Sequence, residues 1–179
     1  MITFSNPKIS IASLVDVADV TALLNSAYRG ESSKLGWTSE VHLIGGNQRT
    51  DEPSLQQVMN LDDSIVLKYV NEDKQIIGCV NLQLHGSKIY LGMFSVAPHL
   101  QGMGIGKQLL NAAEEYANAI QCNTIYMSVI DVREDLINWY KRNGYTATGE
   151  RKEFIEDAVS GNHLQPLAFI LLEKQVSAN

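Results

Sequence analysis

The sequence predicts an α/β protein in which helices cover one mixed sheet of about seven strands. Two observations lead to this class. Short segments with alternating or continuously apolar residues are typical of strands, and four other segments repeat apolar residues at helical spacing. Their order is a strand, two helices, three strands, a helix, a strand, a helix and two strands, which suits an α/β or α+β sheet.

The first half of the chain begins with a short strand and a capped helix. Ser13 can cap this helix, and Asp16 three residues later completes an imperfect capping box. Pro53 lies near the first turn of the second helix, where proline is favoured. A turn at residues 71–74 separates two strands of a hairpin. The expected elements are a strand over 8–13, helices over 13–28 and 53–60, and strands over 64–70, 75–85 and 88–96.

The second half alternates helices with strands and ends on a pair of strands. Its first strand is a continuous apolar run, which fits burial on both faces. Gly144 closes the last helix as the residue after its cap. The expected elements are helices over 105–120 and 133–144, and strands over 124–130, 145–150 and 166–174.

One long stretch, residues 30–53, shows neither helical nor strand periodicity. Irregular stretches of this length inside a compact domain are usually functional or mobile. Elsewhere the chain contains no internal repeat, low-complexity tract or flexible linker. We therefore expect residues 1–179 to form a single domain.

The composition is that of a globular protein and argues against several classes. The formal net charge of −6 disfavours a nucleic-acid partner, which normally requires a basic face. No apolar run is long enough to span a membrane, and the first ten residues do not resemble a signal peptide. Cys79 and Cys122 lie far apart without metal-ligand spacing, so reduced, buried thiols are expected. We expect a cytoplasmic protein with no metal site.

A glycine-rich loop joins the strand over 88–96 to the following helix. Gly102, Gly104 and Gly106 occupy alternate positions in the sequence SVAPHLQGMGIGKQLL. Without β-carbons, they allow several backbone N–H groups to point at one place. The first amides of a helix lack partners, and the helix dipole adds positive potential there. The loop therefore predicts an anion site suited to phosphate or pyrophosphate.

Three phosphate-binding motifs compete for this loop. A dinucleotide fingerprint requires G-x-G-x-x-G in a βαβ unit, whereas the spacing here is G-x-G-x-G after consecutive strands. A P-loop requires G-x-x-x-x-G-K-[ST], and Gly106-Lys107 fits its G-K pair. Gln101 then stands where the first glycine is required, and Gln108 where Ser or Thr is required. The third pattern, Q-x-x-G-x-G with a V-x-P lead-in, fits throughout.

This third pattern resembles the acyl-CoA-binding motif of the GNAT family of N-acetyltransferases. The later sequence INWYKRNGY resembles the second signature of that family, and the two motifs lie in the family's order. The resemblance covers most of the chain, because the element order is also similar. It implies the GNAT fold, whose fourth and fifth strands splay apart, and acetyl-CoA as the cofactor.

The resemblance also implies where the cofactor binds. The pantetheine arm pairs with the backbone of the fourth strand, and the pyrophosphate rests on the amides of the glycine loop. Many members carry an Asn at the position of Arg133, which either reaches the cofactor or an acidic substrate, or pairs within the fold. The implied cofactor-binding residues are Phe94, Ser95, Val96, Gln101, Gly102, Met103, Gly104, Ile105, Gly106, Lys107, Arg133 and Tyr140.

In the reaction that the resemblance implies, an amine attacks the thioester directly within a ternary complex. Tyr140 stands at the family's tyrosine position, where it either protonates the leaving thiolate or only packs on the pantetheine. A backbone N–H of the fourth strand would stabilise the carbonyl oxygen. We favour Glu40 as general base, with Glu31, Asp51, Asp131 and a water chain as alternatives.

The acceptor is expected to be a small-molecule amine or the exposed amino group of a peptide. The irregular stretch lines the acceptor side in this family, so the candidate substrate-binding residues are Tyr28, Arg29, Trp37 and Glu40. Two alternatives keep the fold: a non-catalytic CoA-binding or sensor domain, and an acyltransferase with a longer acyl-CoA or an O-acceptor. The family also includes many dimers, so a homodimer is a further option.

Overall fold

The computed structural model describes residues 2–177 and is built around one seven-stranded sheet with the order β1-β2-β3-β4-β5-β7-β6. The strands are β1 (Ile9–Ile11), β2 (Ser64–Val70), β3 (Ile76–His85), β4 (Lys88–Val96), β5 (Thr124–Ile130), β6 (Thr146–Glu153) and β7 (Ala168–Gln175). The helices are α1 (Val17–Tyr28), α2 (Gly30–Ser33), α3 (Glu52–Met59), α4 (Ile105–Ala119) and α5 (Glu134–Arg142).

This architecture confirms the expected α/β class with a mixed sheet. The pairing of β4 with β5 is parallel, whereas the other neighbouring strands pair antiparallel. The four expected helices are present, and α2 is a fifth in the stretch expected to be irregular. A helix of four residues makes barely one turn, which is too short for apolar residues to repeat at helical spacing.

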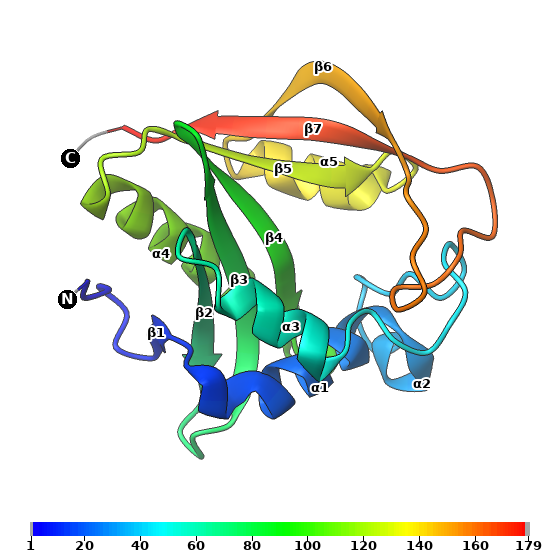
Figure 1. The fold of residues 1–179 in the computed structure, drawn as a ribbon, viewed down its shortest axis with the longest axis horizontal. Coiled ribbons are helices and arrows are strands. Elements are labelled where there is room, and N and C mark those ends of the chain that lie inside the picture. The colour runs from blue at the N-terminus through cyan, green and yellow to red at the C-terminus, as the bar shows by residue number, and fades with distance from the viewer. Residues whose placement is uncertain (1, 178–179) are drawn as a thin grey trace.

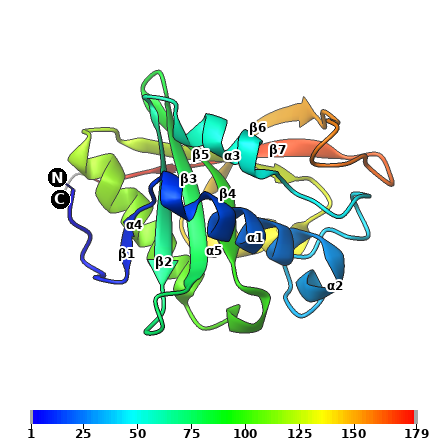
Figure 2. The ribbon, with the colours of Figure 1, turned by 60° about the horizontal axis from the view of Figure 1, so that its bottom comes forward.

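The helices form a layer on each side of the sheet. α1 and α3 cover one face of the strands β2 to β4, and α4 and α5 lie on the opposite face (Figure 1; Figure 2). Val20 and Leu24 of α1 and Leu109 and Ala113 of α4 are fully buried, with 0% of each residue exposed. The apolar repeats seen in the sequence are therefore the faces that pack on the sheet.

The helix ends follow the signals in the sequence. The backbone N–H of Ser13 donates to Asp16 Oδ2 at 2.8 Å, which completes a capping box before α1. The N–H of Ser54 donates to Asp51 Oδ1 at 2.8 Å, so Asp51 caps α3. After α5 the chain turns at Gly144 with φ +93°, a conformation that glycine adopts without strain.

The two parallel strands pair over a short length only. Ile89 faces Ile125 and Tyr90 faces Tyr126, and beyond this point β4 and β5 diverge (Figure 1). The backbone of β4 past Tyr90 therefore has no strand beside it on the β5 side. The splay expected of the fourth and fifth strands is present.

A bulge in β4 accompanies this divergence. Residues 93–94 of β4 lie opposite the single residue Val80 of β3, because the register between the strands shifts there. Met93 adopts φ +47°, and a bulge of this kind bends its strand and increases the local twist. The bend carries the end of β4 away from β5.

Other expectations concern cysteines, metals and membranes. Cys79 and Cys122 are both free and buried. Within residues 2–177, no three His, Cys, Asp or Glu side chains are grouped so that they could hold a metal ion. No helix in the same residues combines the length and apolar character required to cross a bilayer.

Candidate functional site

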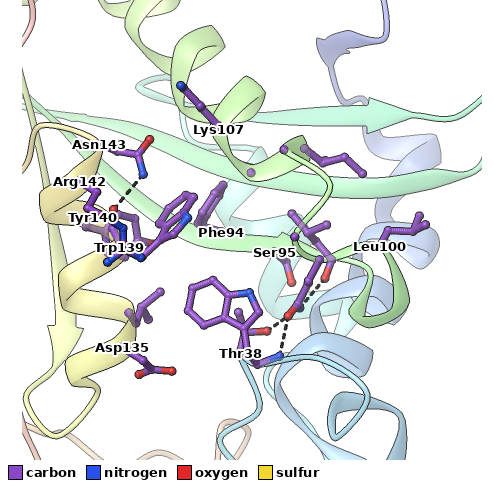
Figure 3. Close-up of a pocket in the computed structure, with 18 of the residues that line it drawn as sticks. Thr38, Phe94, Ser95, Leu100, Lys107, Asp135, Trp139, Tyr140, Arg142 and Asn143 are labelled. Carbon is purple, nitrogen blue, oxygen red and sulfur yellow. Dashed lines mark hydrogen bonds between the residues drawn. The ribbon is translucent and has the colours of Figure 1, made fainter.

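A main cleft of about 600 Å³ lies between the end of β4, the glycine loop and α5. The glycine loop and the first turn of α4 form one side, and α5 forms the facing side (Figure 3). Tyr28 from the end of α1 and residues 37–38 also line it. Three segments that are distant in sequence therefore meet at the open edge of β4.

The glycine loop presents its backbone to this cleft. Gly102 and Gly104 have φ of +86° and +82°, and a β-carbon built on either would meet no atom within 4 Å. The first helical bond of α4 runs from the N–H of Gln108 to the oxygen of Gly104, at 3.1 Å. The amides of residues 105–107 therefore lack helical partners and, with the helix dipole, can hold a pyrophosphate.

Gln101 fastens the loop to its surroundings through its side chain. Its Nε2 donates to Thr38 Oγ1 at 2.8 Å and to the Val96 carbonyl at 3.0 Å, and its Oε1 accepts from the N–H of Trp37 at 2.8 Å. A β-carbon at Gly36 would lie 2.5 Å from that oxygen, so a larger residue there would displace the Gln101 side chain. Gln101 thus joins β4, the glycine loop and residues 36–38.

Aromatic side chains form the wall opposite the loop. Phe94 of β4 and Trp139 of α5 are stacked with 5.8 Å between ring centroids, and Trp37 lies 6.1 Å from Trp139 (Figure 3). Trp37, which was expected to bind the substrate, lines the main cleft beside Trp139, where Gln101 accepts a hydrogen bond from its backbone N–H. Its position is set by the tertiary link to the loop, which its sequence neighbours do not reveal.

Two positively charged side chains line the main cleft. Lys107 of α4 and Arg142 of α5 line it from facing sides, and neither forms an ion pair with any residue in the described part of the chain (Figure 3). Arg142, Trp139 and Asn143 were not singled out as cofactor-binding residues from the sequence. They follow Asp135 and Leu136 at helical spacing and therefore share the face of α5 that carries Tyr140. That shared face was the sequence signal that could have identified them.

Tyr140 lies at the inner end of the main cleft. Only 5% of the residue is exposed, and its hydroxyl has no hydrogen-bond partner among residues 2–177. Burial raises the pKa of Tyr140 well above its ordinary value. The phenol therefore remains protonated at neutral pH and is able to donate its proton.

Two smaller hollows lie on the other side of the splay. The inner hollow, of about 120 Å³, is bounded by β4, β5 and Tyr140, and the outer hollow, of about 170 Å³, lies beside residues 154–160. Both hollows are lined by Glu40, Arg49, Ile130 and Phe169. Tyr28, Phe94, Leu136 and Tyr140 line both the inner hollow and the main cleft, so these spaces adjoin at the end of the splay.

Tyr28 fixes the wall at this junction. Its hydroxyl donates to the carbonyl oxygen of Phe94 in β4. Burial raises the pKa of the Tyr28 phenol well above its ordinary value, and the charge of Glu40 adds to this shift. Tyr28 therefore remains a neutral donor to the strand.

Glu40 and Arg29 form a buried ion pair at the two hollows. Glu40 Oε2 lies 2.6 Å from Arg29 Nη1, and Nη2 of Arg29 donates to the Ser160 carbonyl at 3.0 Å. The pair ties the end of α1 to the connection between β6 and β7. Glu40 lines both hollows, whereas the buried Arg29 lines only the outer one.

The alternative bases are engaged elsewhere. Glu31 is exposed and pairs with Lys34, and Asp51 caps α3. Asp131 accepts from the Arg151 guanidinium at 2.6 Å and from the Ala168 backbone. These three carboxylates line neither the main cleft nor the two hollows.

Arg133 and Met103 lie outside the main cleft. Arg133 is buried, donates to the carbonyls of Trp37 and Thr38 at 3.0 and 3.3 Å, and pairs with Asp135 at 3.2 Å. Of the alternatives for this arginine, the structure shows the pairing within the fold. Met103 is exposed and does not line the cleft.

Comparison with known proteins agrees with this geometry. The sequence model of the acetyltransferase (GNAT) family matches residues 33–145. The chain is 33% identical over 64 residues to a Bacillus subtilis subsp. natto protein named "Probable spermine N(1)-acetyltransferase". That match covers 35% of this chain and 42% of the relative, so the chain spans less than half of that protein's length.

Two solved structures share the fold at low sequence identity. The Escherichia coli ribosomal-protein-S18-alanine N-acetyltransferase aligns with TM-score 0.68 and 13% identity, over 96% of this chain and 94% of that one. A spermidine N-acetyltransferase chimera from Vibrio cholerae aligns with TM-score 0.65 and 16% identity, over 93% of both chains. The family match spans the glycine loop, the splayed strands and α5, and the chain therefore belongs to the GNAT acetyltransferase family.

Proposed function

We propose that this protein is a cytoplasmic enzyme that transfers an acetyl group from acetyl-CoA to a primary amine in a ternary complex. The observation that carries the proposal is the position of Tyr140. Its hydroxyl has no partner among the described residues, and its side chain lines both the main cleft and the inner hollow. The names of two relatives, for spermine and spermidine N-acetyltransferases, support an amine as acceptor.

The residues of the main cleft fit acetyl-CoA. The loop at Gly102 and Gly104 leaves open space where β-carbons would stand, and free amides begin α4. Lys107 and Arg142 add positive charge for phosphate groups. The edge of β4 beyond Tyr90 is free of β5, so its backbone can pair with an extended arm. Bound acetyl-CoA supplies a thioester, whose acyl carbon is open to attack by an amine.

Each proposed side-chain role is the transfer of one proton. Tyr140 holds the proton that the departing sulfur receives when the C–S bond breaks. The amine nitrogen forms the new C–N bond and releases a proton to Glu40 or to a water chain that leads to solvent. That released proton balances the one that Tyr140 donates, so the phenol is restored once protons exchange with solvent.

A non-catalytic CoA sensor is the main competing function. A sensor requires the glycine loop but gives no reason for an unpartnered phenol between two adjoining spaces. An acyltransferase with a longer acyl-CoA or an O-acceptor shares the main cleft and differs only in what fills the space beyond Tyr140.

The experiment measures donor binding and turnover separately. Saturating acetyl-CoA should raise the melting temperature by mass action. At a concentration of 100 times its Kd, the ligand adds about 2.7 kcal/mol to the free energy of unfolding. Release of the CoA thiol is then followed with a panel of amines, amino acids, polyamines and peptides. Binding without thiol release from any acceptor would favour the sensor, and the absence of binding would contradict both functions.

A further inference from the structure

We infer that the acceptor carries an anionic group, a carboxylate or a phosphate-type oxyanion, and that the guanidinium of Arg49 receives it. This inference rests on the proposed function, because it specifies which amines that enzyme accepts. It is carried by the position and the unbalanced charge of Arg49 in the wall shared by the two hollows.

The backbone of Arg49 is held firmly against α1. Asn25 Oδ1 accepts from the N–H groups of Arg49 and Thr50 at 2.6 and 3.1 Å, and Asn25 Nδ2 donates to the Thr50 carbonyl at 3.0 Å. One side chain thus clamps both residues within the long stretch before α3. The base of the Arg49 side chain has a fixed position, as a recognition residue requires.

The side chain of Arg49 extends toward Tyr28 and the inner hollow that Tyr140 also lines. Its guanidinium carbon lies 6.0 Å from the ring centroid of Tyr28, within the range of a cation–π contact. Tyr28 also lines the main cleft and binds the Phe94 carbonyl. Arg49 and Tyr140 line the same inner hollow, so one small ligand can reach both.

Of the arginines around the hollows, Arg49 is the one whose charge is not balanced. Arg29 pairs with Glu40 at 2.6 Å, and Arg133 pairs with Asp135 at 3.2 Å. Arg49 has no carboxylate within 4.0 Å among residues 2–177. A half-buried guanidinium has lost part of its hydration, and an anionic ligand would restore the missing partner.

Apart from Glu40, the carboxylate that lines the outer hollow is Asp157, and hydrogen bonds within its own turn engage it. Its Oδ1 accepts from the N–H groups of Val159 and Ser160 at 2.8 and 2.6 Å, and Oδ2 accepts from the Ser160 hydroxyl. These bonds from Ser160 lower the pKa of Asp157, and the charge of Arg49 adds to the shift. The charge of Arg49 therefore acts on Asp157 from a distance, and the two side chains do not form an ion pair.

The size and sign of the site limit the acceptor further. The inner hollow of about 120 Å³ is much smaller than the main cleft of about 600 Å³, so it suits a small group beside Tyr140. A small amine with an anionic end can place that end at Arg49 and its nitrogen toward Tyr140. A polyamine would instead bring further positive charge to an unbalanced arginine, which opposes its binding.

The test compares two classes of acceptor on the wild-type protein and on Arg49→Gln. The anionic class contains amino acids and aminoalkyl phosphonates, which separates carboxylate from phosphate-type recognition, and the cationic class contains spermine and spermidine. We expect thiol release with an anionic amine, and a loss of about 10-fold or more in kcat/KM in Arg49→Gln, mainly through KM. Arg49→Lys should recover part of that loss, because it keeps the charge without the two-pronged geometry.

Arg151→Gln provides the matched control, since it removes an exposed arginine on β6 that lies outside the cleft and both hollows. Its kcat/KM for the anionic amine should equal that of the wild-type protein, and all variants should bind acetyl-CoA with wild-type affinity. Preferential acetylation of a polyamine, or an Arg49→Gln variant with an unchanged KM for the anionic amine, would overturn the inference while leaving the proposed function intact. Acetyl-CoA binding without thiol release from either class or from any acceptor of the wider panel contradicts the proposed function and removes the inference with it.

Discussion

Glu40 and Arg29 form an ion pair whose two side chains are almost entirely withdrawn from solvent, with 1% of the arginine and 10% of the glutamate side chain exposed. The pair stands where the stretch after α1 meets the connection between β6 and β7. A carboxylate in this position has a structural role and a proposed catalytic role, and the two compete. It neutralises Arg29, and under the proposed function it is also the favoured acceptor of the amine proton.

The structural duty predicts a large effect on stability. Glu40→Ala leaves the Arg29 guanidinium buried without its partner, so we expect a loss of about 3–5 kcal/mol in the free energy of unfolding. Urea denaturation measures this loss directly. Glu31→Ala is the matched control, because it breaks the exposed pair with Lys34 and should leave the unfolding curve unchanged. Equal stability of the Glu40→Ala and wild-type proteins would contradict a structural role for the pair.

The chemical duty is tested with Glu40→Gln, which keeps the shape and a hydrogen bond to Arg29 but removes the basic carboxylate. If Glu40 takes the amine proton, kcat should fall by about 100-fold or more, while acetyl-CoA affinity is retained. The measurement is the pH profile of kcat in variants that are still folded. A wild-type kcat in Glu40→Gln would exclude Glu40 as base and leave the water chain.

Tyr140 should be indispensable for turnover and dispensable for donor binding. Tyr140→Phe removes one hydroxyl, so kcat should fall by about 100-fold or more, with an unchanged Kd for acetyl-CoA. Tyr145→Phe is the control, since it removes the buried, unpartnered hydroxyl of a neighbouring ring, whose centroid lies 5.8 Å from that of Tyr140. Because burial raises the pKa of Tyr140, the wild-type acid should remain protonated beyond the pH at which an exposed tyrosine ionises. A full rate in Tyr140→Phe would remove it from the mechanism.

The glycine loop offers a test that separates backbone strain from ligand space. Gly104→Ala and Gly86→Ala both place a β-carbon at positive φ, +82° and +61°, and in both cases that carbon meets nothing within 4 Å. We expect each substitution to cost about 1–2 kcal/mol of stability. Only Gly104→Ala should also weaken acetyl-CoA binding, as measured by calorimetry, because its β-carbon enters the space above the loop amides. A similar weakening in Gly86→Ala would show that strain alone is responsible.

Alkaline pH should destabilise the protein through buried acids that remain protonated in the fold. Burial raises the pKa of the Cys79 thiol from 9.0 to about 12. The folded state therefore holds this proton more tightly than the unfolded chain, and its contribution is complete below pH 9 and declines between pH 9 and 12. The expected slope is about 1.4 kcal/mol per pH unit for one group.

Denaturation at several pH values measures this slope, and Cys79→Ala identifies its source. In Cys79→Ala the decline should begin only near pH 10, where the buried phenols of Tyr28, Tyr140 and Tyr145, whose pKa values are also raised, start to contribute. An onset at pH 9 that persists in Cys79→Ala would assign it to another group.

The sequence was sufficient for the elements whose signals are local. The alternation in β2 to β4 and the helical repeat in α4 reflect burial against the sheet, and burial selects residue types at a fixed period. The glycine loop was equally legible, because positive φ at Gly102 and Gly104 and free amides at a helix start depend on a few neighbouring residues. Local rules therefore determined the class, the strand order along the chain and the donor motif.

The acceptor side depended on contacts that no local pattern records. Trp37 stands in the main cleft because Gln101, far along the chain, binds its backbone N–H. Arg133 is committed to the carbonyls of residues 37 and 38, and Arg49 is positioned by Asn25 and lies over Tyr28. Charged residues in an irregular stretch look alike in sequence, since their environment is supplied by distant segments. Only the tertiary structure decided which arginines around the hollows were paired with a carboxylate and which one, Arg49, has no such partner among residues 2–177.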